Sequence, residues 1–279
     1  MLRLESKDAG RPAPNRLTPD RLTAYRVNRV PGQQGSVPER LVTTRLFYHY
    51  LVYIASIRPF FFGLNTMSIS AELVRKLAER YHTPLYLFEE EIIRRQCRTL
   101  RSAITYPNSV IRYACKALTI GPILEIIKEE GLWIDAVSLN EVERALLAGF
   151  TVKQILYTGE GASRFAFEQL INLGVLINCS SIDQLKLIGS IRPGTSCSIR
   201  FNPGEGHGHS SKVNTGGPAS KHGVYLDQID EVKKILKAYN LKLIGVHAHI
   251  GSGTELSHWL RINEIVYGIA EQFQGLEFV

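Results

Sequence analysis

Long apolar runs and closely spaced cysteine pairs are both missing from this 279-residue sequence. The longest apolar patch, residues 47–57, ends at Arg58-Pro59, and eleven residues are too few to cross a bilayer. The N-terminal part also lacks a small-residue cleavage site, which argues against a secretory signal peptide. None of the four cysteines shows CxxC spacing, so they indicate reduced cytosolic thiols and not a disulfide framework or zinc site.

Outside the N-terminal segment, little net charge is present. The first 45 residues carry nine Lys or Arg against four Asp or Glu, which leaves only +2 of the total +7 for the rest. A nucleic-acid-binding surface is therefore not expected. Residues 1–66 have no sustained apolar period and are predicted to be an atypical extension, disordered or not native. Met67 as the true start and an Arg-rich organelle transit peptide are both open explanations of this segment.

From Ser70 onward, helical periodicity alternates with short apolar runs. Strands separated by helices of this length predict βαβ units and a parallel sheet. A (β/α)8 barrel suits the number of units better than an open doubly wound sheet, and no GxGxxG motif supports a dinucleotide site. The predicted helices cover residues 71–81, 89–103, 120–130, 139–148, 164–173, 182–189, 226–239 and 256–273, and the predicted strands cover 84–88, 110–116, 133–138, 155–158, 175–179, 196–202, 243–250 and 276–279.

Residues 67–279 are therefore predicted to form an incomplete barrel. Seven strands lie between residues 110 and 279, and the run at 84–88 would lead into the sheet, so the eighth strand is not accounted for. The sequence stops inside the last predicted strand, where a domain is not expected to end. We expect a truncated product or fragment.

Reactive groups of a parallel barrel gather at the carboxyl ends of its strands. Lys116 ends one strand behind Tyr113, and partial burial there would leave more of the amine neutral and nucleophilic, as Schiff-base chemistry requires. A merely solvated lysine is the alternative. Asp135 and Ser138 close the next strand, and Glu141 follows one helical turn on. These carboxylates would orient a protonated amine, or Ser138 and Glu141 would form a helix capping box.

Two later strands add a cation and two histidines. Arg200 should point the same way as Ser198 and Asn202, and inside a barrel it requires an anionic partner. His247 and His249 project to the same side of their strand, because side chains alternate with period two. His249, at the end of that strand, is placed to stack on a flat ring.

A phosphate site is predicted directly after these histidines. Gly251-Ser252-Gly253 offers backbone N–H groups and a hydroxyl just before a helix begins. The polar, glycine-rich segment 202–223 is long enough for a lid over the barrel mouth, or it is a plain surface loop. A lysine, a stacking histidine and a phosphate cradle on one rim together fit pyridoxal 5'-phosphate (PLP).

A metal-dependent hydrolase is the competing class of enzyme. His207 with His209, and His247 with His249, form two HxH pairs, which are typical of metal sites on barrel strands. A further ligand from another strand end would be needed, and none stands out in the sequence.

Residues 68–279 resemble the fold-type III PLP decarboxylases, and within them the diaminopimelate decarboxylase family most closely. The glycine-rich stretch with its HGHS and NTGG elements is the most specific part of the resemblance. Three further motifs carry it: Tyr113-Ala-Cys-Lys116-Ala, Asp135-Ala-Val-Ser138-Leu-Asn-Glu141 and His247-Ala-His249-Ile-Gly-Ser-Gly253.

The resemblance implies an alanine racemase-like TIM-type barrel, Lys116 as the lysine bonded to PLP, and His249 over the cofactor ring. Ser252, with Gly251 and Gly253, would contact the phosphate. The lysine and cofactor would be supported by Asp135, Glu141 and Arg200. The implied reaction is decarboxylation of meso-2,6-diaminopimelate to L-lysine and CO2, in a cytoplasmic homodimer with no nucleic-acid or membrane partner and no metal.

Two departures from the family pattern are visible. His82 stands where the family usually has a small residue. The sequence also ends before the family's Gly-Gly-Gly phosphate loop, before the acidic residue that holds the pyridine nitrogen, and before the C-terminal β-domain. The resemblance therefore implies that this polypeptide is catalytically incompetent, or an inactive remnant.

Overall fold

The computed structural model describes residues 22–25, 69–205, 217, 220, 222–249, 251 and 256–279. The chain divides into two compact units, residues 1–93 and residues 94–279. The first unit contributes a short antiparallel pair and a helix. The second unit contains the parallel sheet and the predicted site.

In the first unit, helix α2 (Ala71–Tyr81) has the predicted bounds, and the hydroxyl of Ser70 caps it by accepting from Leu73 N at 3.2 Å. Strand β2 (Tyr86–Glu89) pairs antiparallel with β1 (Leu22–Tyr25). Strand β2 belongs to this two-stranded sheet and not to the six-stranded parallel sheet, so the prediction that residues 84–88 lead into the parallel sheet is wrong. The rest of residues 1–66 lies outside the described residues, so the interpretation of that segment as an extension stays a prediction.

The second unit is built on six parallel strands that follow one another in chain order. Neighbouring strands in chain order are the arrangement of a (β/α) barrel, whereas a doubly wound sheet reverses its order at a switch point. This confirms the predicted fold class. The strands are β3 (Arg112–Ala114), β4 (Trp133–Ala136), β5 (Ile155–Tyr157), β6 (Leu176–Cys179), β7 (Ser196–Phe201) and β8 (Lys242–Ala248).

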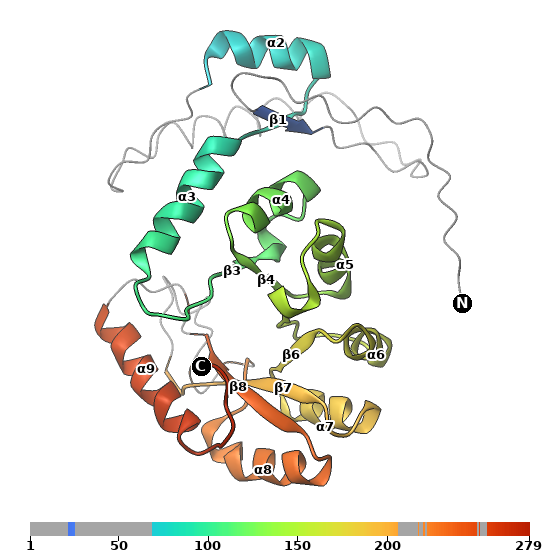
Figure 1. The fold of residues 1–279 in the computed structure, drawn as a ribbon, viewed down its shortest axis with the longest axis vertical. Helices are drawn as coiled ribbons and strands as arrows, with labels where there is room; N and C mark the ends of the chain where they lie inside the picture. Colours follow the sequence, from blue (N-terminus) through green and yellow to red (C-terminus); the bar gives the residue numbers. More distant parts are fainter. Residues whose placement is uncertain are drawn as a thin grey trace. The chain divides into compact units, whose positions relative to one another are not determined.

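Helices α4 to α9 follow one another around the outer side of these strands (Figure 1). Each of α4 to α8 turns an apolar stripe toward the sheet, and Leu124, Val142, Leu170, Leu185 and Val232 are completely buried. Burying a side chain of this size contributes roughly 1.5–3 kcal/mol. The helices are α3 (Glu90–Ala103), α4 (Gly121–Glu129), α5 (Leu139–Leu147), α6 (Arg164–Leu173), α7 (Ile182–Ile191), α8 (Ile229–Ala238) and α9 (Leu256–Ala270), with short 3-10 turns η1 (Cys115–Ala117), η2 (Val152–Gln154) and η4 (Leu226–Gln228).

The strand predicted at residues 276–279 is reduced to one bridge between Phe278 and Gly245 of β8. Glu277 N donates to Ile244 O at 2.7 Å, and Val246 N donates to Phe278 O at 3.3 Å. Within the described residues this segment pairs on one side only, which explains why the ladder is short. Gly245 makes the approach possible, since a Cβ at that position would lie 2.1 Å from the Phe278 ring.

A buried carboxylate joins α3 to the end of α4. The Glu130 carboxylate accepts hydrogen bonds from Arg98 Nε at 2.9 Å and from Arg98 Nη2 at 2.8 Å. It also accepts one from Arg94 Nη1 at 3.1 Å. The hydrogen bonds from Arg98, more than those from Arg94, hold the pKa of Glu130 below its ordinary value, against the opposing effect of burial. Arg101 adds a bond from Nη1 to the Glu130 carbonyl at 2.9 Å. Losing one partner of such a buried network is costly, because the other partner stays charged.

Candidate active site

Lys116 lies on the 3-10 turn η1, not at the end of a strand. Strand β3 stops at Ala114, and Leu118 N closes the turn on Cys115 O at 3.2 Å. The Lys116 side chain is exposed, whereas the neighbouring Cys115 is completely buried. The predictions that Lys116 ends the strand and is partly desolvated are therefore wrong, although its position after β3 is the expected end of the sheet.

Asp135 of β4 lies close enough to Lys116 to interact electrostatically. Burial raises the pKa of Asp135, while a hydrogen bond from Thr158 and the charges of Lys116, Arg112 and Arg200 lower it in that order. The hydroxyl of Thr158, which follows β5, donates to Asp135 Oδ1. The sequence analysis did not single out Thr158, although it is a polar residue at the carboxyl end of a strand.

Glu141 takes part in the capping arrangement. The hydroxyl of Ser138 accepts from Glu141 N at 3.2 Å and begins α5, as predicted. The carboxylate returns to the backbone through Oε2, which accepts from Val137 N at 2.9 Å, one residue before the position that a standard capping box uses. The Glu141 carboxylate therefore has a structural bond, and its role toward a cofactor stays a prediction.

Arg200 has the anionic partner that its position required. Its Nη1 donates to Glu160 Oε1 at 2.8 Å, and its side chain is only 13% exposed. Burial lowers the pKa of Arg200, and the charges of Glu160 and Asp135 raise it. Sequence reasoning missed Glu160, which sits in the loop directly after β5. Its place at the carboxyl end of a strand is the signal that would have found it.

His247 belongs to a polar network on the inner side of the sheet. Its Nδ1 lies 3.3 Å from Asn178 Nδ2, and Asn178 Oδ1 accepts from Ser198 Oγ at 2.9 Å. Burial lowers the pKa of His247 to about 4, and the positive charges of Arg200 and His249 act in the same direction. The ring is therefore neutral at physiological pH.

His249 follows β8 and is exposed. Partial desolvation by the surrounding protein lowers its pKa, with further lowering by the charges of Arg200, Lys116 and His222, while Glu160 raises it. These interactions place His249 among the other groups at the barrel mouth. The structure brings Lys116, Asp135, Arg200 and His249 close enough for their charges to act on one another, and their roles toward a cofactor stay predictions.

The phosphate segment is described only at Gly251, which has a φ of 94°. This is a backbone conformation that favours glycine. Ser252 and Gly253 lie outside the described residues, so the predicted phosphate cradle stays a prediction.

The side chain of Asn202 forms hydrogen bonds to Gly204 and Gly217, which are both part of the glycine-rich segment that was predicted to be a lid. The side chain is buried, and its Oδ1 accepts from Gly204 N and from Gly217 N, each at 3.0 Å. Its Nδ2 donates to Gly217 O at 3.0 Å. Residues 206–216, which include His207 and His209, lie outside the described residues, and the lid stays a prediction.

The described part of the chain contains no cluster of three or more His, Cys, Asp or Glu side chains arranged to hold a metal ion. None of its helices is long and apolar enough to cross a membrane. All four cysteines are buried and free, in agreement with the prediction of reduced thiols.

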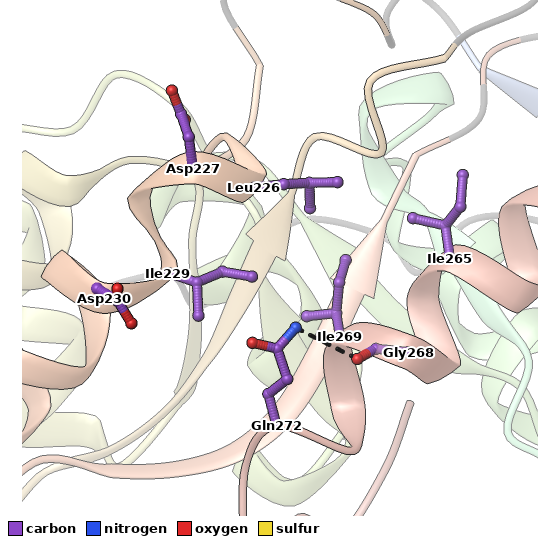
Figure 2. A pocket seen from close by; sticks show the side chains of 8 residues that line it. All are labelled: Leu226, Asp227, Ile229, Asp230, Ile265, Gly268, Ile269 and Gln272. Carbon is purple, nitrogen blue, oxygen red and sulfur yellow. Dashed lines mark hydrogen bonds between the residues drawn. The ribbon is translucent and has the colours of Figure 1, made fainter.

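A groove of about 410 Å³ lies between η4, α8 and α9 (Figure 2). Apolar side chains from both helices line it, together with two carboxylates, and Gln272 Nε2 donates to Gly268 O at 3.4 Å beside it. No predicted site residue lines this groove. Its lining consists of Leu226, Asp227, Ile229, Asp230, Ile265, Gly268, Ile269 and Gln272.

The fold and the site together define a parallel (β/α)-barrel protein with an exposed amine, a partly buried carboxylate and two histidines of lowered pKa at the carboxyl ends of its strands. Residues 90–278 match the family model described as "Pyridoxal-dependent decarboxylase, pyridoxal binding domain". The chain belongs to this family, and its cofactor is PLP. The free amine of Lys116 next to Asp135 and His249 fits a cofactor that carries an aldehyde on a flat, charged ring.

The chain is similar to curated and solved diaminopimelate decarboxylases. It is 36% identical over 194 residues to the enzyme of Escherichia coli (strain K12), covering 68% of this chain and 45% of the relative. It is 40% identical over 185 residues to the enzyme of Streptomyces coelicolor, covering 65% of this chain and 41% of the relative. A crystal structure of diaminopimelate decarboxylase from Helicobacter pylori complexed with L-lysine matches with a TM-score of 0.62 and 29% identity, covering 67% of this chain and 50% of that one. The chain thus spans about half the length of the relatives that it matches.

Proposed function

We propose that the chain carries the cofactor site of a PLP-dependent decarboxylase that converts meso-2,6-diaminopimelate to L-lysine and CO2, with Lys116 as the cofactor-bonding lysine. The observation that carries the proposal is the position of Lys116 on the turn directly after β3, at the carboxyl ends of the parallel strands, where its charge acts on both Asp135 and His249. The similarity to diaminopimelate decarboxylases supports the substrate. A cytoplasmic homodimer is part of the same proposal.

In this proposal, Lys116 Nζ would hold the cofactor through its aldehyde group, with loss of water, and His249 would contact the cofactor ring. Gly251, Ser252 and Gly253 hold the phosphate, and Asp135, Glu141 and Arg200 support the cofactor from the inner side. When bound, PLP accepts the electron pair that CO2 leaves on the substrate α-carbon.

The electrostatics of the site explain how these side chains would act. Asp135, held by Thr158, places a carboxylate beside Lys116 and stabilises positive charge on the nitrogen bonded there. The pKa of His249 is lowered, mainly by burial, which favours the neutral form of the ring that can pack on a flat cofactor without adding a cation. When it is not bonded to the cofactor, the Lys116 amine could hold a proton and deliver it to the substrate α-carbon.

Absorbance spectroscopy tests the assignment of the lysine. PLP added to the protein is expected to give a saturable visible band, which Lys116→Ala abolishes. Lys153→Ala is the matched control, because Lys153 is an exposed lysine on the 3-10 turn η2. A band that survives in Lys116→Ala but disappears in another lysine variant would contradict the assignment.

The substrate is tested with the PLP-loaded protein. We expect meso-2,6-diaminopimelate to change the visible band. CO2 release from carboxyl-labelled substrate tests the separate prediction that this polypeptide is catalytically incompetent. L-Ornithine at the same concentration serves as the comparison. A response to L-ornithine without one to meso-diaminopimelate would contradict the proposed substrate and leave the cofactor assignment intact.

A further inference from the structure

One oxygen of Glu160 lies close to two basic side chains from different parts of the chain, and of these two contacts only the one with Arg200 is a hydrogen bond. Arg200 Nη1, on β7, lies 2.8 Å from Glu160 Oε1, and His222 Nδ1 lies 2.7 Å from the same oxygen. The Glu160 side chain is 34% exposed, and those of Arg200 and His222 are 13% and 26% exposed. The cluster is therefore partly shielded from water, which strengthens its interactions relative to those of a surface ion pair.

The backbone that carries Glu160 is fixed by its neighbours. Gln184 of α7 is buried, and its Nε2 donates to Gly159 O at 3.1 Å and to Glu160 O at 2.8 Å. Its Oε1 accepts from Ser180 N at 2.9 Å, which fixes the orientation of the amide. At Gly159 a Cβ would lie 2.2 Å from the Tyr157 hydroxyl, so the loop passes where only glycine fits. The position of the Glu160 carboxylate is thus built into the fold.

Glu160 also competes with Asp135 for the same guanidinium. Both carboxylates act on Arg200, with Glu160 the stronger of the two, and only Glu160 is hydrogen-bonded to it. Asp135 is therefore left to Thr158 and to the neighbourhood of Lys116. Without the Glu160 carboxylate, Asp135 becomes the remaining anion for Arg200.

We propose that Glu160 is a positioning residue of the cofactor site, which holds Arg200 at the barrel mouth beside His222 and so keeps Asp135 available to Lys116. The inference rests on the proposed function, because it assigns Glu160 to the site of the PLP-bonding lysine. Glu160 acts through Arg200 and does not itself bond to the cofactor.

The first test compares PLP affinity, measured from the visible band, in three variants of the 279-residue protein. Glu160→Gln keeps the size of the side chain and removes its charge, and we expect PLP affinity to fall by about tenfold. Glu160→Asp restores the charge and is expected to recover most of the affinity. Glu168→Gln is the control, since Glu168 forms an exposed pair with Arg164 one helical turn away. Wild-type affinity in Glu160→Gln, or an equal loss in Glu168→Gln, would overturn the proposal.

The second test needs no cofactor and measures the pKa of His249 by NMR titration of the histidine rings. Glu160 raises the pKa of His249, so Glu160→Gln should lower that pKa, and Glu160→Asp should reverse the change. A His249 titration that is identical in all forms would overturn the proposal. If the wild-type protein took up no PLP, the proposed function would fail, while this titration would still decide whether Glu160 controls the charge balance around His249.

Discussion

Arg200 and His247 stand opposite each other in the register of β7 and β8, a cation beside a neutral ring. Burial is the main reason that the pKa of His247 falls to about 4, and the Arg200 charge adds to it. At neutral pH this pair of residues therefore carries one positive charge, on Arg200, and not two. A neutral His247 leaves the guanidinium free to pair with the carboxylates around it.

The depressed pKa of His247 predicts a loss of stability in acid. An unfolded chain protonates this histidine near pH 6.5, whereas the folded protein does so near pH 4, so the free energy of unfolding falls as the pH drops through this window. Between pH 7 and pH 5 the contribution is about 2 kcal/mol. We expect the loss over this interval, measured by denaturant unfolding, to be smaller by that amount in His247→Gln. The same loss in both proteins would contradict the prediction.

Thr158 is predicted to control the ionisation of Asp135. Thr158→Val keeps the shape of the side chain and removes the hydrogen bond that lowers the pKa of Asp135, so this pKa should rise further above its ordinary value. The charged carboxylate then lacks a partner, at a cost of about 1–3 kcal/mol. Carboxyl 13C NMR measures the pKa, and unfolding at pH 7 measures the cost. An unchanged Asp135 titration would show that the hydrogen bond has no such role.

The loop after β5 offers a matched pair of glycine substitutions. In Gly159→Ala the new Cβ would lie 2.2 Å from the Tyr157 hydroxyl and 2.5 Å from Val137 O, whereas at Gly161 no atom lies within 4 Å. We expect Gly159→Ala to lower the free energy of unfolding by about 1–3 kcal/mol, because the backbone oxygen cannot move away cheaply. Gly161→Ala should stay within about 0.5 kcal/mol of wild type. Equal effects at the two positions would be inconsistent with the packing of this loop.

Periodicity was sufficient to predict much of the fold. Helices α2 and α6 have their predicted bounds, and the order of strands and helices from β3 to β8 follows the alternation of the two periods. Local patterns could not show that β2 pairs with β1, because that pairing joins residues more than 60 positions apart. They also could not show the 3-10 turn at Lys116, which depends on the burial of Cys115 by the rest of the barrel.

The sequence predicted only part of the site, because contacts between strands are not visible in local patterns. Lys116, Asp135, Arg200 and His249 were found because each stands at or near a strand end with a chemistry of its own. Glu160 and Thr158 stand at such an end as well, but their roles depend on partners in other strands: Glu160 bonds to a residue 40 positions away and Thr158 to one 23 positions away. Spacing along the chain does not encode such contacts.

Reductive trapping tests the central claim most directly. The 279-residue protein is incubated with PLP, reduced with borohydride, digested and analysed by mass spectrometry for the modified lysine. We predict that the phosphopyridoxyl group is found on Lys116, in the peptide that contains Tyr113-Ala-Cys-Lys116. Modification concentrated on a different lysine, or spread evenly over the exposed lysines, would contradict the assignment of Lys116 as the cofactor-bonding residue.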